Sequence, residues 1–400
     1  MKSKVVKFCY SIIVLLGIGL VYGWSVFVEP LEREFDWQRS DTSLTFTISM
    51  SALCIGLLIG GYINRLSDKP FITLTASGIL IFTGFFFTSN AMQLWQFYVF
   101  YGVFSGLGTG LAYVEIIAIC GMIFPKKKGF VSGILFMSFG LGAFVLGTTC
   151  SALIDIIGWR IIFRAIGILF GFMLIIEGGI LKSECKNKKV INAEIAMPEG
   201  YNKDVISLQM IKKKEFILFY IWLIFISSSG LAMMAHIAPY ITDIGHSAKF
   251  AAMFAGMVSM CNGLGRVVYG IIYDKIKVRC TMTIISIVFI VSAVIIVLSS
   301  MTENVGLLAI GCVLIGISFG GAPISSSVVI SSLYGTRFFS SNFGVVSTQV
   351  MISSLIGPYI SSKFYMWSGN YDSTFYAIMV LSIVNLLVMH LFFRAAKEKL

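Results

Sequence analysis

Apolar residues dominate twelve separate stretches of the chain, each close to the length that crosses a membrane. A helix needs about 20 mostly apolar residues to span the hydrocarbon core. None of the stretches alternates apolar and polar residues with a strand's period of two, so the pattern predicts helices rather than a β-barrel. The predicted spans are residues 6–28, 44–64, 71–89, 95–123, 129–153, 161–181, 215–241, 248–272, 280–299, 305–330, 340–362 and 373–394.

Composition places the chain in the same class. Hydrophobic residues make up 57% of it and charged residues only 12%, whereas a soluble domain carries about 25% charged residues. So little polar surface could not cover a water-soluble globule of this size. We therefore predict an all-α membrane protein with twelve transmembrane helices. Its 39 glycines suit helices packed closely in lipid, and Gly102, Gly106 and Gly110, four residues apart, predict a packing seam.

Basic residues collect on one side of this predicted arrangement. Most of the 30 lysines and arginines lie at the two termini and in the loops that follow even-numbered spans, so both termini are predicted to be cytoplasmic. The net charge of +11 therefore reflects topology, and no nucleic-acid partner is predicted. The longest polar stretch, 182–214, is predicted to be a cytoplasmic linker between two six-helix bundles, residues 1–181 and 215–400.

Some classes of chemistry find no support in the sequence. The chain has three histidines and no cluster of cysteine, histidine or acidic residues with the spacing of metal ligands. No nucleophile lies beside a general base in a recognisable motif. We expect no metal, no cofactor, no catalytic residue and no enzymatic activity.

A short pattern recurs in the two halves. Gly60, Asn64 and Arg65 stand at the cytoplasmic end of the second span, and Gly270, Asp274 and Lys275 stand 210 residues later at the end of the eighth. Glycine permits close helix approach, and a polar pair beside it can cap or bridge helix ends. We call these the first and second motif copies and predict a gating role for both. Parallel repeats of six spans are the architecture of major facilitator superfamily transporters.

Further motifs narrow the resemblance. They are YGWSVF (22–27), EFDWQR (34–39), GLGTGLAY (106–113), FPKKKG (124–129), GWR (158–160), HIAP (236–239), NGLGR (262–266) and NFG (342–344). Together they resemble the oxalate/formate antiporter family, which is related to the monocarboxylate transporters, over essentially the whole chain outside the linker. The resemblance implies the major facilitator fold and transport by alternating access. It also expects an aspartate where the first motif copy has Asn64.

Arg266 is the first candidate for substrate binding. It lies eight residues before Asp274, hence about 12 Å inside the membrane, and Asn262 precedes it by one helical turn. A charge in hydrocarbon is costly without a partner, and a guanidinium beside an amide suits bidentate capture of a carboxylate. In the resembling family an arginine at this place binds the anion. The alternative is a structural ion pair with another helix.

Glu115 is a candidate for proton coupling. It lies eleven residues before Lys126, hence about 16 Å from the cytoplasmic surface. A carboxyl group there could carry a proton, could neutralise Arg266, or could face a polar cavity passively. The resembling family is not usually acidic at this position.

Aromatic and imidazole side chains supply further candidates. Tyr22, Trp24, Tyr113 and His236 fall in helices 1, 4 and 7, which line the pathway in the resembling superfamily. Tyr113 and His236 could hydrogen-bond a carboxylate or a hydroxyl group, or could be satisfied between helices. For Tyr22 and Trp24 the alternative is packing or anchoring at the membrane interface.

One departure bears on the substrate. Oxalate exchangers of the resembling family use a lysine in helix 11 as a second cation, and Val350 stands at that place. Two carboxylates facing only Arg266 would leave one charge uncompensated. The sequence therefore predicts a monocarboxylate such as lactate, pyruvate or formate ahead of oxalate, moved by proton symport or anion exchange. The alternatives are export of a drug or organic cation and a non-transporting membrane sensor. We expect a monomer in a bilayer, most consistent with the plasma membrane of a bacterium.

Overall fold

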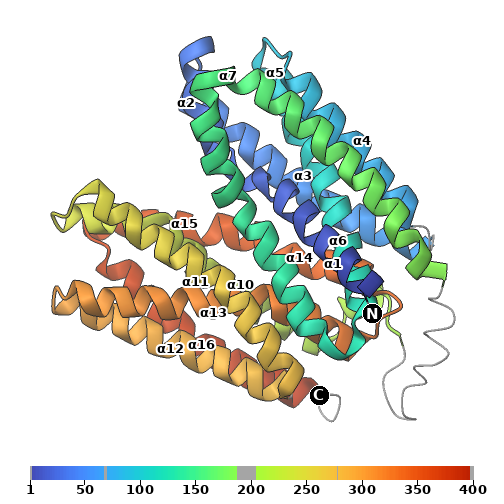
Figure 1. The fold of residues 1–400 in the computed structure, drawn as a ribbon. Helices are drawn as coiled ribbons and strands as arrows, with labels where there is room; N and C mark the ends of the chain where they lie inside the picture. Colours follow the sequence, from blue (N-terminus) through green and yellow to red (C-terminus); the bar gives the residue numbers. More distant parts are fainter. Residues whose placement is uncertain (1, 67–69, 187–203, 277, 397–400) are drawn as a thin grey trace. The chain divides into compact units, whose positions relative to one another are not determined.

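The computed structural model describes residues 2–66, 70–186, 204–276 and 278–396, and every regular element among them is helical. Figure 1 shows these helices with their labels. The elements of the first half are α1 (Lys2–Ile18), η1 (Gly19–Gly23), α2 (Ser25–Phe35), α3 (Arg39–Leu66), α4 (Pro70–Thr88), α5 (Leu94–Gln96), η2 (Phe97–Ser105), α6 (Gly106–Ile123), η3 (Pro125–Lys127) and α7 (Lys128–Lys186). Those of the second are α9 (Ser207–Met210), α10 (Lys214–Asp243), α11 (Ala248–Lys275), α12 (Val278–Met301), α13 (Val305–Tyr334), α14 (Phe339–Ser347), α15 (Gln349–Ser368) and α16 (Asp372–Ala396).

Eleven of these helical stretches are long and apolar enough to cross a membrane, and one of them contains two spans. The 59 residues of α7 would extend about 88 Å as one helix, far more than a bilayer needs. Gly158 interrupts α7 with φ 77° and ψ 152°, a backbone conformation that glycine adopts readily. Figure 1 shows that α7 turns back on itself. The predicted all-α fold with twelve spans is therefore confirmed.

The helices form two compact units. Unit 1 contains residues 1–125, 134–204 and 336–345, and unit 2 contains residues 126–133, 205–335 and 346–400. In unit 1, α3 packs along η2 and α6, and α4 packs along the same two elements. In unit 2, α13 packs on α11 and α12, while α10 packs on α15 and α16. Segments 126–133 and 336–345 each belong to the unit other than the one that contains most of the same half of the chain. Most of the predicted linker, 187–203, lies outside the described residues.

Glycines bring neighbouring helices of unit 1 close together. A Cβ atom on Gly102 would lie 2.8 Å from Ile48, and one on Gly106 would lie 2.5 Å from the carbonyl oxygen of Ser49. At Gly110 the added carbon would meet the carbonyl oxygen of Leu53 at 2.2 Å. The predicted packing seam, which lies along η2 and α6, is confirmed, and its partner is α3.

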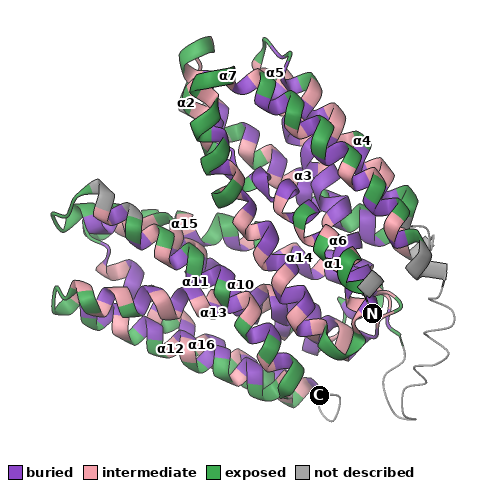
Figure 2. Ribbon diagram, viewed as in Figure 1, coloured by how far each residue is buried: buried purple, intermediate pink, exposed green. Residues whose placement is uncertain are grey.

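Many large apolar residues of both units are exposed, and Figure 2 shows exposed positions along the helices of both units. Phe144, Phe172 and Leu387 are examples of exposed apolar residues within predicted spans. In water such surface would be unfavourable, but in a bilayer it faces hydrocarbon. The burial pattern thus agrees with a chain that crosses the membrane many times.

Three spans are less regular than the sequence predicted. The first predicted span, 6–28, contains the 3₁₀ segment η1 between α1 and α2. A Cβ on Gly19 in this segment would lie only 2.0 Å from the carbonyl oxygen of Phe139, so close packing against α7 accompanies the irregular turn. The fourth span begins with a π-helix, η2, a form often found at functional sites. The eleventh is divided at Thr348 into α14 and α15.

Candidate functional site

Arg266 and Asn262 lie side by side on α11. The Ser247 hydroxyl caps this helix by accepting a hydrogen bond from the backbone N–H of Phe250. One turn separates Asn262 from Arg266, so both side chains share a face, and Nη2 of Arg266 donates to Oδ1 of Asn262 over 2.8 Å. Arg266 is half-buried, and Asn262 is 4% exposed. The predicted pairing of guanidinium and amide is present.

This hydrogen bond fixes the orientation of the Asn262 amide. A guanidinium only donates, so the amide oxygen must face Arg266 and the NH₂ group must point elsewhere. Nδ2 of Asn262 is buried, and no acceptor within the described residues lies at hydrogen-bonding distance from it. A buried donor without an acceptor is costly. Arg266 and Asn262 therefore offer donors of the kind that an anion satisfies.

Helix α13 holds this part of α11 in place within unit 2. A Cβ atom on Gly320 would lie 2.4 Å from the carbonyl oxygen of Asn262, and one on Gly316 would lie 2.7 Å from that of Val258. Gly265 of α11 approaches the carbonyl oxygen of Ile317 in the same way, at 2.4 Å. Such close backbone contacts leave little freedom for α11, so the donors stand on a rigid support.

Tyr22 and Tyr113 belong to one aromatic cluster in unit 1. The Tyr22 ring lies 5.3 Å from that of Phe139 in an edge-to-face arrangement, and the Tyr113 ring lies 4.6 Å from the same phenylalanine. Phe136 and Phe343 stack on Tyr113 from α7 and α14. Tyr22 is 41% exposed, so the structure brings these two candidates together on a partly open surface.

Trp24 has a different environment from Tyr22, although only one residue separates them. It is 3% exposed, and its Nε1 donates to the carbonyl oxygen of Thr42 over 2.8 Å. Its ring packs 4.5 Å from that of Tyr101. These contacts attach the irregular first span to α3 and η2.

His236 lies at another depth in unit 2 than Arg266. It is seven residues from the end of α10, about 10 Å, whereas Arg266 is 18 residues from the start of α11, about 27 Å, and a short loop joins those ends. Nε2 of His236 lies 3.1 Å from the carbonyl oxygen of Pro358. A carbonyl only accepts, so Nε2 carries a proton and donates. The Tyr371 ring is 5.5 Å away.

The first motif copy, near the end of α3, contacts α6. Nδ2 of Asn64 donates to Oε2 of Glu115 over 2.5 Å, and Glu115 is almost completely buried. A Cβ atom on Gly60 would lie 2.8 Å from Cγ1 of Val114 in the same helix. The contact joins two departures from the resembling family, the asparagine in α3 and the acid in α6. The Arg65 side chain lies outside the described part of the structure.

The second motif copy contacts the start of α7. The Asp274 carboxylate accepts hydrogen bonds from the backbone N–H groups of Gly129 and Phe130, each over 2.8 Å. A Cβ atom on Gly270 would lie 2.3 Å from the carbonyl oxygen of Gly129. The carboxylate satisfies N–H groups that a helix start leaves unpaired and complements its dipole. Lys275, next in sequence, is exposed.

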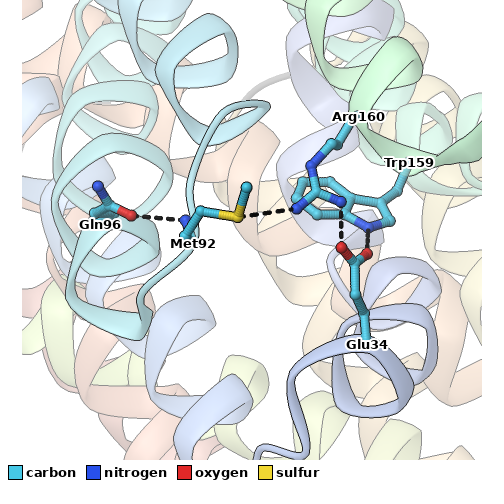
Figure 3. Close-up of polar contacts among 5 residues, drawn as sticks. All are labelled: Glu34, Met92, Gln96, Trp159 and Arg160. Carbon is cyan, nitrogen blue, oxygen red and sulfur yellow. Dashed lines mark hydrogen bonds and ion pairs between the residues drawn. The ribbon is translucent and has the colours of Figure 1, made fainter.

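A polar network near the lysine-poor end of unit 1 unites two of the quoted motifs (Figure 3). The Glu34 carboxylate accepts hydrogen bonds from Nε1 of Trp159, over 2.6 Å, and from Arg160, which also forms an ion pair with it. Arg160 further reaches the Met92 sulfur. Partial burial raises the pKa of Glu34, but its bonds to Arg160 and Trp159 outweigh this and lower that pKa below the ordinary value of 4.5.

Glu177 is a buried acid that was not among the predicted candidates. Glu177 of α7 is completely buried, and its Oε1 lies 2.5 Å from the Ser11 hydroxyl of α1. The only signal in the sequence is an acidic residue five positions before Lys182, inside a predicted span. In the described ranges, no three histidine, cysteine or acidic side chains gather as metal ligands.

These features define a polytopic helical transporter with polar groups inside its spans, and comparisons with known proteins agree. The chain belongs to the Major Facilitator Superfamily, which it matches over residues 9–358. It is 26% identical to an uncharacterized MFS-type transporter of Escherichia coli, YhjX, covering 86% of this chain and 84% of that one. It is 23% identical to the oxalate:formate antiporter of Oxalobacter formigenes, covering 86% and 82%, and 23% identical to human monocarboxylate transporter 12, covering 88% and 72%.

Solved structures show the same fold. The proton:xylose symporter XylE bound to a halogenated glucose has a TM-score of 0.69 with 14% identity, covering 97% of this chain and 96% of that one. The fucose:proton symporter FucP of E. coli has a TM-score of 0.64 with 11% identity, covering 98% and 99%. The chain is therefore a multi-pass membrane transporter and not an enzyme.

Proposed function

We propose that this transporter moves a small monocarboxylate, such as lactate, pyruvate or formate, by alternating access, with proton symport or anion exchange as the driving reaction. Arg266 binds the carboxylate, and Asn262 donates a second hydrogen bond to it. The relatives named as oxalate:formate and monocarboxylate transporters support this substrate class.

The observation that carries the proposal is the Arg266–Asn262 pair. Two donor groups stand one helical turn apart inside a membrane span, and the buried Asn262 NH₂ has no acceptor in the described part of the chain. A carboxylate has two acceptor oxygens, so one anion can bind a guanidinium and an amide together. A cationic substrate would be repelled at this place.

The substrate's charge follows from the eleventh span. Val350, where the resemblance expects a lysine, is an apolar side chain at the start of α15. A dicarboxylate would place one of its charges where Val350 provides no compensation, and this is expensive at low dielectric. We therefore favour a monocarboxylate over oxalate.

The other candidate residues have different proposed roles. The partly open aromatic cluster supports Tyr22 and Tyr113 as substrate-facing side chains. The bonds of Trp24 to Thr42 and of His236 to Pro358 favour positioning of helices rather than substrate contact. Glu115 remains the candidate proton carrier from the sequence, and the two motif copies remain the candidate gating elements. We further propose that the protein works as a monomer in a bacterial inner membrane.

The test is uptake of lactate by the purified chain in proteoliposomes. Arg266→Gln removes the charged donor, and we expect uptake efficiency to fall about 100-fold, the cost of about 3 kcal/mol for losing a charge-assisted pair. Arg266→Lys, which keeps the charge but loses the planar fork, should recover part of the activity. Arg33→Gln is the matched control, because Arg33 is exposed and pairs only locally with Glu29. Unchanged uptake by Arg266→Gln would disprove the proposal.

Competition separates the alternatives. Formate, pyruvate and lactate should inhibit one another, and oxalate should inhibit more weakly. Inhibition by a lipophilic cation without inhibition by carboxylates would indicate a drug exporter. Binding of lactate without flux would indicate a sensor.

A further inference from the structure

Glu177 lies among three helices of unit 1. It belongs to the α7 arm that follows Gly158, and it precedes Lys182 by five residues, about 8 Å. Its closest polar partner is Ser11 of α1, which is also completely buried. The Cys120 thiol of α6 donates to the Ser11 hydroxyl over 3.4 Å. The three side chains form a compact polar group about one turn inside the lysine-rich end of the unit.

The hydrogen bonds of this group can be counted. Ser11 has one proton to donate, and its hydroxyl reaches two acceptors, Oε1 of Glu177 over 2.5 Å and the carbonyl oxygen of Lys7 over 3.1 Å. One proton cannot serve both, so when the hydroxyl donates to Lys7 it must accept from both Cys120 and Glu177. A carboxyl group donates only when it is protonated. The full set of contacts is therefore satisfied when Glu177 is a neutral acid.

The second carboxyl oxygen points to the same state. Oε2 of Glu177 is buried and has no hydrogen-bond partner among the described residues. An ionised carboxylate shares its charge between both oxygens, so the charged form would bury an unsatisfied charged atom at a cost of several kcal/mol. The carbonyl oxygen of a neutral acid costs much less to leave in that position.

Tyr10 and Cys120, the titratable groups that face Glu177 from α1 and α6, carry no positive charge. On α1, Tyr10 faces Glu177 and donates its own proton to the carbonyl oxygen of Met173. On α6, Cys120 is the group that faces it. On the same helix, the Lys182 ammonium lies 5.3 Å from the ring centre of Phe71 of α4. No ion pair of Glu177 is found within residues 2–66, 70–186, 204–276 and 278–396.

We infer that Glu177, with Ser11 and Cys120, forms a proton-binding site in the N-terminal half of the transporter. A proton adds to the carboxylate while the group is open to one side of the membrane, and the acid then donates to Ser11. The same proton leaves to the other side when α1, α6 and α7 change their packing during the cycle. The site is separate from Glu115, whose carboxylate accepts from Asn64. The coupling part of this inference rests on the proposed transport function.

Infrared difference spectroscopy of the whole chain in lipid tests the proton directly. The wild type should show the C=O stretch of a protonated carboxylic acid at neutral pH, with the shift expected in heavy water. Glu177→Gln should remove this band, while Glu29→Gln, a change at an exposed acid, should keep it. Ser11→Ala should shift the band, because the acid loses its acceptor. A band unaffected by Glu177→Gln would overturn the inference.

Transport measurements test the coupling. With a gradient of about one pH unit, a symporter that moves one proton together with each anion can accumulate substrate about tenfold. We expect Glu177→Gln to abolish this accumulation and to retain lactate counterflow, which needs no net proton movement. Accumulation equal to the wild type would overturn the coupling. Should Glu177→Gln fail to fold, Ser11→Ala with its altered band and reduced accumulation provides the second variant. If the wild type moves no carboxylate, the proposed function fails, but the infrared result still decides the proton site.

Discussion

The two motif copies occupy corresponding places in the sequence and make opposite kinds of contact. In unit 1, Asn64 donates a hydrogen bond to the buried carboxylate of Glu115. In unit 2, Asp274 accepts hydrogen bonds from the backbone N–H groups of Gly129 and Phe130. Asn64 therefore acts as a hydrogen-bond donor to an acid, and Asp274 acts as a hydrogen-bond acceptor at the start of a helix.

This difference explains why Asn64 is not an aspartate. Two carboxylates at hydrogen-bonding distance repel each other, whereas an amide NH₂ satisfies a carboxylate directly. The resemblance expects an acid in α3, where Asn64 stands, and not in α6, where Glu115 stands. The two departures from the family pattern are in contact with each other, and they should be tested together.

The largest expected effect comes from restoring the aspartate. Asn64→Asp places a second carboxylate against Glu115, and we expect a loss of about 3 kcal/mol in unfolding free energy, comparable with leaving a buried charge unpaired. Thermal unfolding of the purified chain in detergent measures it. Asn64→Asp combined with Glu115→Gln recreates the pair with its groups exchanged and should recover most of the loss. A double variant no more stable than Asn64→Asp would show that the pair is not coupled.

The glycines of the two copies should also respond differently. Gly270→Ala places a Cβ atom 2.3 Å from the backbone oxygen of Gly129, which cannot move without shifting a helix. Gly60→Ala places its Cβ 2.8 Å from the end of the Val114 side chain, which can rotate. We expect the free energy of unfolding to fall by about 2 kcal/mol for Gly270→Ala and by less than about 1 kcal/mol for Gly60→Ala. The cost of overpacking depends on whether the neighbouring atoms can move away.

Thermal unfolding and uptake assays measure both glycine variants. Gly121→Ala is the control, because nothing lies within 4 Å of its added carbon. Equal losses at Gly60 and Gly270 would mean that backbone proximity is not what distinguishes the copies.

Local patterns in the sequence were sufficient for the spans, the repeat and the Arg266–Asn262 pair. Each of these depends on residues a few positions apart, and helical geometry fixes which of their side chains share a face. The contact of Asn64 with Glu115 crosses 51 residues and that of Ser11 with Glu177 crosses 166. No local period encodes such pairings, so the partners could not be predicted.

Irregular backbone was the second limit of prediction. Tyr22 and Trp24 flank Gly23 in the first span, yet one is partly exposed and the other is buried. The 3₁₀ segment Gly19–Gly23 changes the direction of successive side chains relative to a regular helix. Because close packing of Gly19 on α7 accompanies this turn, it depends on tertiary contacts that hydropathy does not show.

The cap formed by Asp274 should contribute less than the changes above. Asp274→Asn keeps one acceptor oxygen but turns an NH₂ group toward a backbone N–H, so one of the two bonds is lost. We expect a loss of about 1.5 kcal/mol, typical of a hydrogen bond to a charged group. Lys275→Gln, a change at the exposed neighbour, should stay within about 0.5 kcal/mol. Unfolding midpoints of the two variants provide the measurement, and equal values would contradict a capping role.

The smallest effect is expected where a carboxylate of unit 1 has a cation as its partner. Glu34 pairs with Arg160 and Trp159, and this pairing lowers the pKa of Glu34. A lowered pKa in the folded protein stabilises it at pH values above the ordinary 4.5, and this contribution disappears as the pH falls through the folded value. Because the pair is partly exposed, Glu34→Gln should cost less than about 1 kcal/mol at neutral pH. The difference in unfolding temperature between wild type and variant should shrink below pH 4.5. A difference that stays constant with pH would mean that Glu34 stabilises the protein by hydrogen-bond geometry alone.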